Sequence, residues 1–295
     1  MAAHLGRLAM TLRRAGPADA ARIEAFLAQH PLTSMFLRSN LAQHGTEEAE
    51  APQGTAFYVT QRNGTVSGVF GLTNHGFGLA QAPAATAQDW ADYATAIRGR
   101  RFRGITGVPD QVEAALVALN LDGATFSHRA DEPLYHLTLS QMTAQDALVR
   151  LARAADIPLL ERWFAAYEVD VGQAQPGAAP SVACKQRAVR AVGNPEVALF
   201  QADGHPVAMA GINARVDDTI QIGGVFTPVD LRGRGYARRA LAGLLRRWAQ
   251  RGVTQSILFA FSPPAARAYE ALGYVHVGAY RTALLRAPVM IGETP

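Results

Sequence analysis

The feature that most constrains the fold is a glycine-rich segment between an apolar run and an amphipathic stretch, Val225-Phe226-Thr227-Pro228-Val229-Asp230-Leu231-Arg232-Gly233-Arg234-Gly235-Tyr236-Ala237. Residues 219–227 have the apolar character of a buried strand, and the residues after Gly235 predict a helix that runs to about Arg251. A strand, a glycine turn and a helix N-terminus form an anion site, because free N–H groups and the helix dipole favour negative charge. Glycines allow close backbone approach, and the neighbouring arginines can pair with phosphate oxygens. The segment therefore predicts a site for a pyrophosphate-bearing cofactor.

The spacing of this turn narrows the class of cofactor. No Gly-Lys-Ser/Thr follows, so the turn is not a P-loop, and Gly233-x-Gly235 alone is not the dinucleotide pattern. The turn instead resembles the Arg/Gln-x-x-Gly-x-Gly/Ala signature of the GCN5-related N-acetyltransferases, with Arg232, Gly235 and Ala237 on its fixed positions.

A second segment supports the same resemblance. The run from Ser262 to Tyr274 is similar to the family's Asn-x-x-Ala-x-x-x-Tyr-Glu-x-Leu-Gly-Phe, with Ser262 in place of Asn and Tyr274 in place of Phe. Prolines at 263 and 264 suit the start of a helix, and Gly273 suits its end. The resemblance covers roughly residues 146–287.

The resemblance implies a fold, a cosubstrate and site residues. The implied fold is of the α/β class, with a mixed α+β sheet in which two strands splay apart to admit the pantetheine arm of acetyl-CoA. Tyr269 occupies the position of the acid that protonates the CoA thiolate. The implied activity is direct transfer of an acetyl group from acetyl-CoA to an amine. The implied cofactor-binding residues are Val225, Phe226 and Thr227 along pantetheine, Arg232, Gly233, Arg234, Gly235, Tyr236 and Ala237 at the pyrophosphate, and Ser262.

The proton acceptor for the amine is left open by the sequence. A backbone N–H near Val225 could stabilise the oxyanion. The strand 220–224 carries no carboxylate, so Asp217, Asp218, Glu168 and Tyr167 are loose candidates for the base, and water alone is a further alternative. The acceptor amine and the oligomeric state cannot be read from the sequence.

The order of predicted elements indicates two domains. From 146 onward the pattern reads β-α-α-β-β-β-α-β-α-β-β, with closing strands at 275–279 and 280–285. The first half follows a similar order, and a strand at 134–139 is expected to close it. Its equivalent turn, 82–86, has neither glycine nor arginine. We therefore expect two acyl-CoA N-acyltransferase-like domains in tandem: a degenerate copy over 1–140 and an acetyl-CoA-binding N-acetyltransferase domain over 146–295.

Composition excludes several other classes of protein. The formal charge is +4, and the excess lies from 146 onward, with 17 Lys and Arg against 12 Asp and Glu, too mild for a nucleic-acid partner. One cysteine, no long apolar run and no histidine pair with metal-ligand spacing favour a cytoplasmic protein with no metal and no membrane association. The alternative function is a CoA-binding regulatory protein without turnover.

Overall fold

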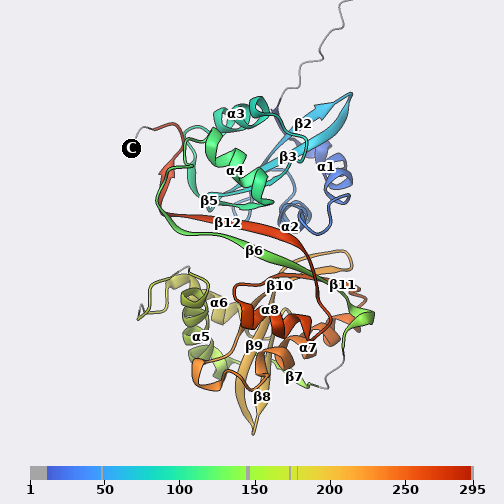
Figure 1. Ribbon diagram of the computed structural model, residues 1–295, viewed down its shortest axis with the longest axis vertical. Coiled ribbons are helices and arrows are strands. Elements are labelled where there is room, and N and C mark those ends of the chain that lie inside the picture. Colours follow the sequence, from blue (N-terminus) through green and yellow to red (C-terminus); the bar gives the residue numbers. More distant parts are fainter. Residues whose placement is uncertain (1–11, 48, 144–146, 173, 178, 294–295) are drawn as a thin grey trace, which may run out of the picture. The chain divides into compact units, whose positions relative to one another are not determined.

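The chain divides into two compact units. The computed structural model describes residues 12–47, 49–143, 147–172, 174–177 and 179–293. One unit comprises residues 1–131 together with 279–295, and the other comprises residues 132–278. Each has its own series of helices and strands and its own hydrophobic clusters (Figure 1).

The second unit is built on a mixed sheet. Its strands lie in the order β7-β8-β9-β10-β11-β6, and all neighbours are antiparallel except β10 and β11, which are parallel. The predicted mixed α/β fold is thus confirmed for this unit. Its elements are the end of β6 (Phe126–Thr138), β7 (Val149–Leu151), α5 (Ile157–Asp170), α6 (Val182–Ala191), β8 (Val197–Ala202), β9 (His205–Val216), β10 (Thr219–Phe226), α7 (Tyr236–Ala249), β11 (Gln255–Phe259), α8 (Pro263–Glu270) and the start of β12 (Val275–Met290).

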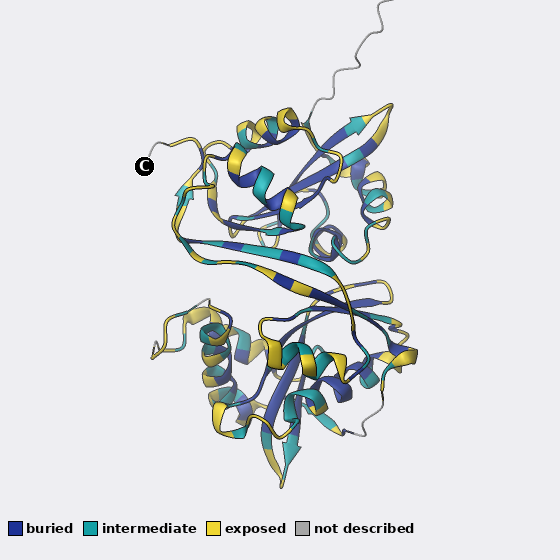
Figure 2. Cartoon of the chain, viewed as in Figure 1, coloured by how far each residue is buried: buried dark blue, intermediate teal, exposed yellow. Residues whose placement is uncertain are grey.

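Helices cover both faces of this sheet. Successive residues of a strand point to opposite faces, and in β8 Leu199 packs with α5 and α6 whereas Ala198 and Phe200 pack with α7. The strands in the middle of the sheet are accordingly buried along most of their length (Figure 2). This alternation separates an α5/α6 face from an α7/α8 face.

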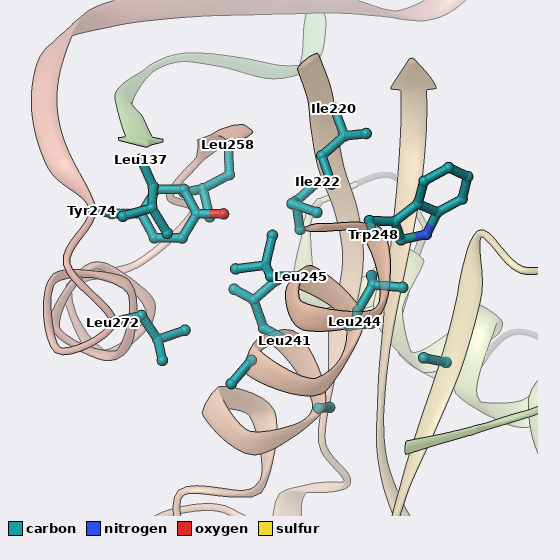
Figure 3. Packing of buried hydrophobic residues seen from close by; sticks show 14 of the residues in the cluster. Leu137, Ile220, Ile222, Leu241, Leu244, Leu245, Trp248, Leu258, Leu272 and Tyr274 are labelled. Carbon is teal, nitrogen blue, oxygen red and sulfur yellow. The ribbon is translucent and has the colours of Figure 1, made fainter. Parts of the chain in front are cut away.

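Helix α7 is held against the sheet by one apolar stripe. Leu241, Leu244, Leu245 and Trp248 follow the i, i+3, i+4, i+7 spacing and meet Ile220 and Ile222 of β10 (Figure 3). The predicted helix is therefore confirmed, with its end at Ala249. At 14 residues, α5 and α7 are far shorter than the ~20 residues that a bilayer requires, and no helix among the described residues is long and apolar enough to span one.

The first unit passes through the same order of elements. Its strands lie in the order β1-β2-β3-β4-β5-β12, with α1 and α2 packed in one hydrophobic cluster and α3 and α4 in another. Its elements are β1 (Arg13–Arg14), α1 (Ala20–Leu27), α2 (Met35–His44), β2 (Thr55–Arg62), β3 (Thr65–Thr73), β4 (Phe77–Gln81), α3 (Ala87–Ala96), β5 (Arg101–Gly107), α4 (Pro109–Ala118), the start of β6 and most of β12.

Both units open with the same ion pair. Arg13 holds the carboxylate of Asp19 through two hydrogen bonds of 2.7 and 2.6 Å, and Arg150 holds Asp156 through two of 2.6 and 2.9 Å. In each case the pair joins the first strand to the helix that follows, and the arginine lowers the pKa of the carboxyl group.

The ends of β6 and β12 correct three sequence predictions. Residues 134–138 do not close the first unit, because they pair with β11 in the second. The two strands predicted at 275–279 and 280–285 are one strand, and residues 281–290 of it pair with β5 in the first unit. Periodicity identified these strands but carries no information about a distant pairing partner. The units consequently differ from the expected ranges 1–140 and 146–295 at both of these strands.

This arrangement predicts which fragments fold. A fragment of residues 146–295 lacks the end of β6 and the turn after it, which supply Tyr135, Leu137 and Leu139 to the core of the second unit. Burial of each such side chain stabilises by about 1.5–3 kcal/mol, and the sum is comparable with the total stability of a domain, about 5–15 kcal/mol. We expect a fragment of residues 132–278 to melt cooperatively by circular dichroism and the 146–295 fragment to show no such transition. A cooperative transition of the 146–295 fragment would contradict this pairing.

Candidate functional site

Strands β10 and β11 are paired over only part of their length. Their parallel ladder comprises Thr219–Gln221 of β10 and Gln255–Ile257 of β11. Beyond it, Ile222 and Gly223 pair with β9, while Leu258 and Phe259 pair with β6. The edges of β10 and β11 that face each other therefore carry backbone groups outside any ladder, as expected of the splayed strands that the sequence resemblance implies.

A β-bulge sits on β10 just after this point. The register between β10 and β9 shifts between Gly223 and Phe226, and Gly224 has a positive φ of 63°. Gly224 and Val225 have no paired residue on either neighbouring strand of the described sheet. A bulge of this kind changes the direction in which the strand presents its backbone.

The turn after β10 leaves the start of α7 uncapped. Gly233 and Gly235 have φ values of 78° and 75°, and Gly235 is the N-cap residue, so no side chain caps the helix. Among the described residues, the backbone N–H groups of residues 233–237 have no hydrogen-bond partner. The first turn of α7 carries no acidic side chain. These N–H groups and the helix dipole together leave a place for an anion.

The two arginines of the turn differ in their contacts. Arg232 donates to the carbonyl oxygen of Thr227 at 3.0 Å and to the carboxylate of Asp170, and its guanidinium lies 6.0 Å from the Phe226 ring. Its side chain therefore anchors the turn to α5. Arg234 is exposed and makes no hydrogen bond or ion pair with a described residue, so its charge is available to a ligand.

The three residues at the end of β10 are only in part accessible. Phe226 is buried in the cluster of α5 and α6, 6.0 Å from Trp163, and Val225 packs against the opposite cluster. The Thr227 hydroxyl is buried with no hydrogen-bond partner among the described residues. An unpartnered buried hydroxyl is unfavourable, and it lies next to the turn where a ligand would supply a partner.

Ser262 and Tyr269 belong to α8 and its cap. The Ser262 hydroxyl accepts the N–H of Ala265 at 3.4 Å, so this side chain caps the helix. The Tyr269 ring packs 6.1 Å from that of Tyr274, whose hydroxyl is bonded to Ser256 at 2.6 Å. The Tyr269 hydroxyl has no such partner in the described part of the chain. Burial raises the pKa of Tyr269, and the nearby Tyr167 raises it further, which keeps the hydroxyl protonated.

Tyr167, which packs on the α5/α6 face of the sheet, lies close enough to Tyr269 to affect its pKa. Burial raises the pKa of the Tyr167 hydroxyl, while a hydrogen bond from the Gly224 N–H and the charge of Arg187 lower it. Glu132 of β6 also lies close enough to affect this pKa, and its side chain is only 4% exposed.

Sequence reasoning missed Glu132 and Arg187. Glu132 was assigned to the first unit because its strand was predicted to close that unit. Arg187 lies between the exposed residues Lys185 and Arg190 on α6, which predicts a solvated helix face. Of the base candidates named from sequence, Asp218 lies at the paired end of β10, away from the bulge, and its carboxylate accepts the hydroxyl groups of Thr219 and Thr254.

In the first unit, the turn before α3 corresponds to the turn before α7, and it is closed by hydrogen bonds within the chain. The Thr86 hydroxyl accepts the Asp89 N–H at 3.3 Å, and the Asp89 carboxylate accepts the Thr86 N–H at 2.7 Å, so α3 begins with a complete capping box. The Ala82 N–H donates to Gln111. A paired backbone with a buried carboxylate repels an anion, in contrast to the start of α7.

Part of the chain matches the model of a known family. Residues 160–274 match the model of the acetyltransferase (GNAT) family, a segment that runs from α5 to the end of the second motif and includes the uncapped turn. A search of curated proteins finds no match. The part of the chain that the structure describes has no group of three or more His, Cys, Asp or Glu side chains placed to hold a metal ion.

Solved structures share the fold along nearly the whole chain. A GCN5-related N-acetyltransferase from Sphaerobacter thermophilus is 16% identical with a TM-score of 0.58, covering 96% of each chain. An acetyltransferase of the GNAT family from Colwellia psychrerythraea is 13% identical with a TM-score of 0.54, covering 94% of this chain and 100% of its own. A GCN5-related N-acetyltransferase from Kribbella flavida is 18% identical with a TM-score of 0.51, covering 91% of this chain and 96% of its own.

Proposed function

We propose that the second unit is an acetyl-CoA-dependent N-acetyltransferase that transfers an acetyl group directly to an amine. The observation that carries this proposal is the uncapped glycine turn at the start of α7. This turn follows β10, whose edge toward β11 has no ladder partner beyond Gln221. The match of residues 160–274 to the acetyltransferase (GNAT) family supports it.

The residues of the site fit acetyl-CoA. The N–H groups of residues 233–237 and the exposed Arg234 suit the pyrophosphate. The Thr227 hydroxyl has no hydrogen-bond partner among the described residues, and a polar ligand could supply one. The stretch of β10 between Ile222 and Val225 lies beyond its ladder with β11 and suits the amide groups of pantetheine, which can pair with it as a strand does. In this assignment Arg232 shapes the turn, and Ser262 acts by capping α8.

We propose further that the first unit is a copy of the same fold without a cofactor site. The shared order of elements and the equivalent Arg–Asp pairs support duplication. The capping box of Thr86 and Asp89 supports the loss of the anion site, because it occupies two N–H groups at the start of the helix and adds a carboxylate there.

Three groups can carry the chemistry of transfer. A backbone N–H at Val225, beside the bulge, can donate to the carbonyl oxygen as negative charge develops on it. The Tyr269 hydroxyl, which burial keeps protonated, can donate to the departing sulfur. Glu132, a buried carboxylate whose charge raises the pKa of Tyr167, is our candidate to accept the proton of the amine directly or through water.

Turnover separates this function from CoA binding alone. Acetyl-CoA consumption should depend on an added amine when the protein is assayed against an amine panel. Binding of CoA with no turnover against any amine would favour a regulatory protein instead.

The turn can be tested at Gly235. We expect Gly235→Val to abolish CoA binding, because its side chain would occupy the place where phosphate approaches the N–H groups. Gly252→Val is the matched control: its φ is 88° against 75°, and a Cβ at either glycine has no atom closer than 3.6 Å. Both variants should lose stability through backbone strain, and only the first should lose affinity in calorimetric titration. Equal CoA affinity of the two folded variants would argue against this site.

The number of CoA molecules bound per chain tests whether the first unit has a cofactor site. Since the start of α3 is capped by Thr86 and Asp89, titration of the whole chain with CoA should give one site. Two sites of similar affinity would show that the first unit is a second working copy.

The role of Tyr269 can be tested with Tyr269→Phe. This variant keeps the ring contacts and removes the proton donor, so kcat should fall about a hundredfold while KM for acetyl-CoA changes little. The effect should not be larger, because a thiolate of pKa about 8.5 is a tolerable leaving group. Tyr274→Phe, which removes the hydroxyl bonded to Ser256, should lower stability and leave kcat nearly unchanged. Near-normal kcat in Tyr269→Phe would assign this residue to packing.

A further inference from the structure

Arg187 is a cation that the proposed chemistry does not use. It lies on α6, with its guanidinium carbon 4.4 Å from the centre of the Phe164 ring and 5.7 Å from that of Tyr167. Contact with two aromatic rings fixes the planar guanidinium in one position. A group that is already fixed loses little entropy when it binds a ligand.

The position of this guanidinium is at the bulge of β10. A Cβ built on Gly224 would lie 3.0 Å from Nη2 of Arg187, so the absence of a side chain at Gly224 is what allows the approach. Gly224 is one of the two β10 residues without a paired residue on a neighbouring strand. Arg187 therefore reaches the same stretch of β10 to which acetyl transfer is assigned.

Arg187 lacks an acceptor for its N–H groups. Its half-buried guanidinium makes no hydrogen bond and no ion pair within 4.0 Å with any residue that the structure describes. The nearby Glu168 shares a hydrogen bond with the Cys184 thiol. Burial lowers the pKa of Arg187, yet an arginine remains charged and has five N–H donors to satisfy. A partly desolvated cation without hydrogen-bond acceptors is stabilised when an anion binds to it.

The pyrophosphate is not the anion that fits here. Its proposed site is at the start of α7, and α7 packs on the opposite face of the sheet from α5 and α6. Arg187 approaches β10 from the α5/α6 face, with Tyr167 and hence Glu132 close by. The neighbourhood thus offers a cation for an anionic group and a carboxylate for an amine.

We propose that the acceptor is a small amine that also carries a carboxylate, and that Arg187 binds this carboxylate. Two parallel N–H···O bonds from one guanidinium suit a carboxylate and position its molecule precisely. The amine of the same molecule then faces the bulge of β10 on the side of Glu132. That the bound molecule is the acetyl acceptor rests on the function proposed above.

Binding of paired probes tests the carboxylate site without requiring turnover. The probes are a panel of N-acetyl amino acids, each with its C-terminal amide, titrated by calorimetry in the presence of saturating CoA. We expect at least one acid to bind roughly ten- to a hundredfold more tightly than its amide, the range for a hydrogen bond to a charged group. Wild-type protein that distinguishes no acid from its amide would overturn the proposal.

Variants of α6 assign the preference to one residue. Arg187→Gln should remove the preference for the acid, and Arg187→Lys, which keeps the charge and loses the two-pronged geometry, should retain part of it. Arg190→Gln is the matched control, since it removes an exposed arginine from the same helix and should leave the preference intact. Melting temperature and CoA titration report whether each variant is folded. A preference that survives in Arg187→Gln would contradict the assignment.

Failure of this proposal is distinguishable from failure of the proposed function. An acid preference that depends on Arg187, without acetyl transfer to any amine, would refute the enzyme and leave the carboxylate site. Acetyl transfer to amines with no preference for acids would support the enzyme and refute the carboxylate site.

Discussion

Backbone pairing between β10 and β11 ends at Gln221 and Ile257, and the geometry of the site depends on this limit. Up to that point the backbone groups of the two strands pair with each other, whereas beyond it each strand pairs only with its other neighbour, β9 or β6. The bulge at Gly224 bends β10 further and leaves Gly224 and Val225 outside both strand ladders of the described sheet, although the Gly224 N–H bonds to Tyr167. Unpaired backbone groups are unfavourable unless water or a ligand bonds to them. The sheet therefore keeps a strand-like binding edge in its interior, between the Tyr167 and Tyr269 sides.

The turn before α3 and the turn before α7 differ mainly in their capping residues. Helices α3 and α7 occupy the same place in the order of elements. At α3, Thr86 and Asp89 supply hydrogen bonds and a negative charge from within the chain. At α7, Gly235 supplies neither, so the dipole and the N–H groups are available to an external anion. The backbone plan can be the same while the choice of capping residue decides whether a ligand is needed.

Local patterns predicted the parts of the site that are local. The strand, glycine turn and helix from Thr219 to Ala249 lie close to where periodicity and turn residues put them. Interactions between distant segments were not accessible in this way. Nothing in residues 134–139 indicates that their partner is β11, and so Glu132 could not be associated with α5. Nothing in the sequence singled out Arg187, because its aromatic neighbours and Gly224 come from other elements.

The return of the last strand to the first unit has a consequence for synthesis on the ribosome. Residues 281–290 are translated after all of the second unit, and they are the native neighbours of β5. Until they emerge, β5 presents an open edge, and Ala283, Leu285 and Ile291 are missing from the core around it. The second unit, by contrast, has all of its strands once residue 278 has been made. Of the two units, the one whose synthesis starts first is thus the one that completes its folding last, and its exposed edge depends on protection from other chains during that interval.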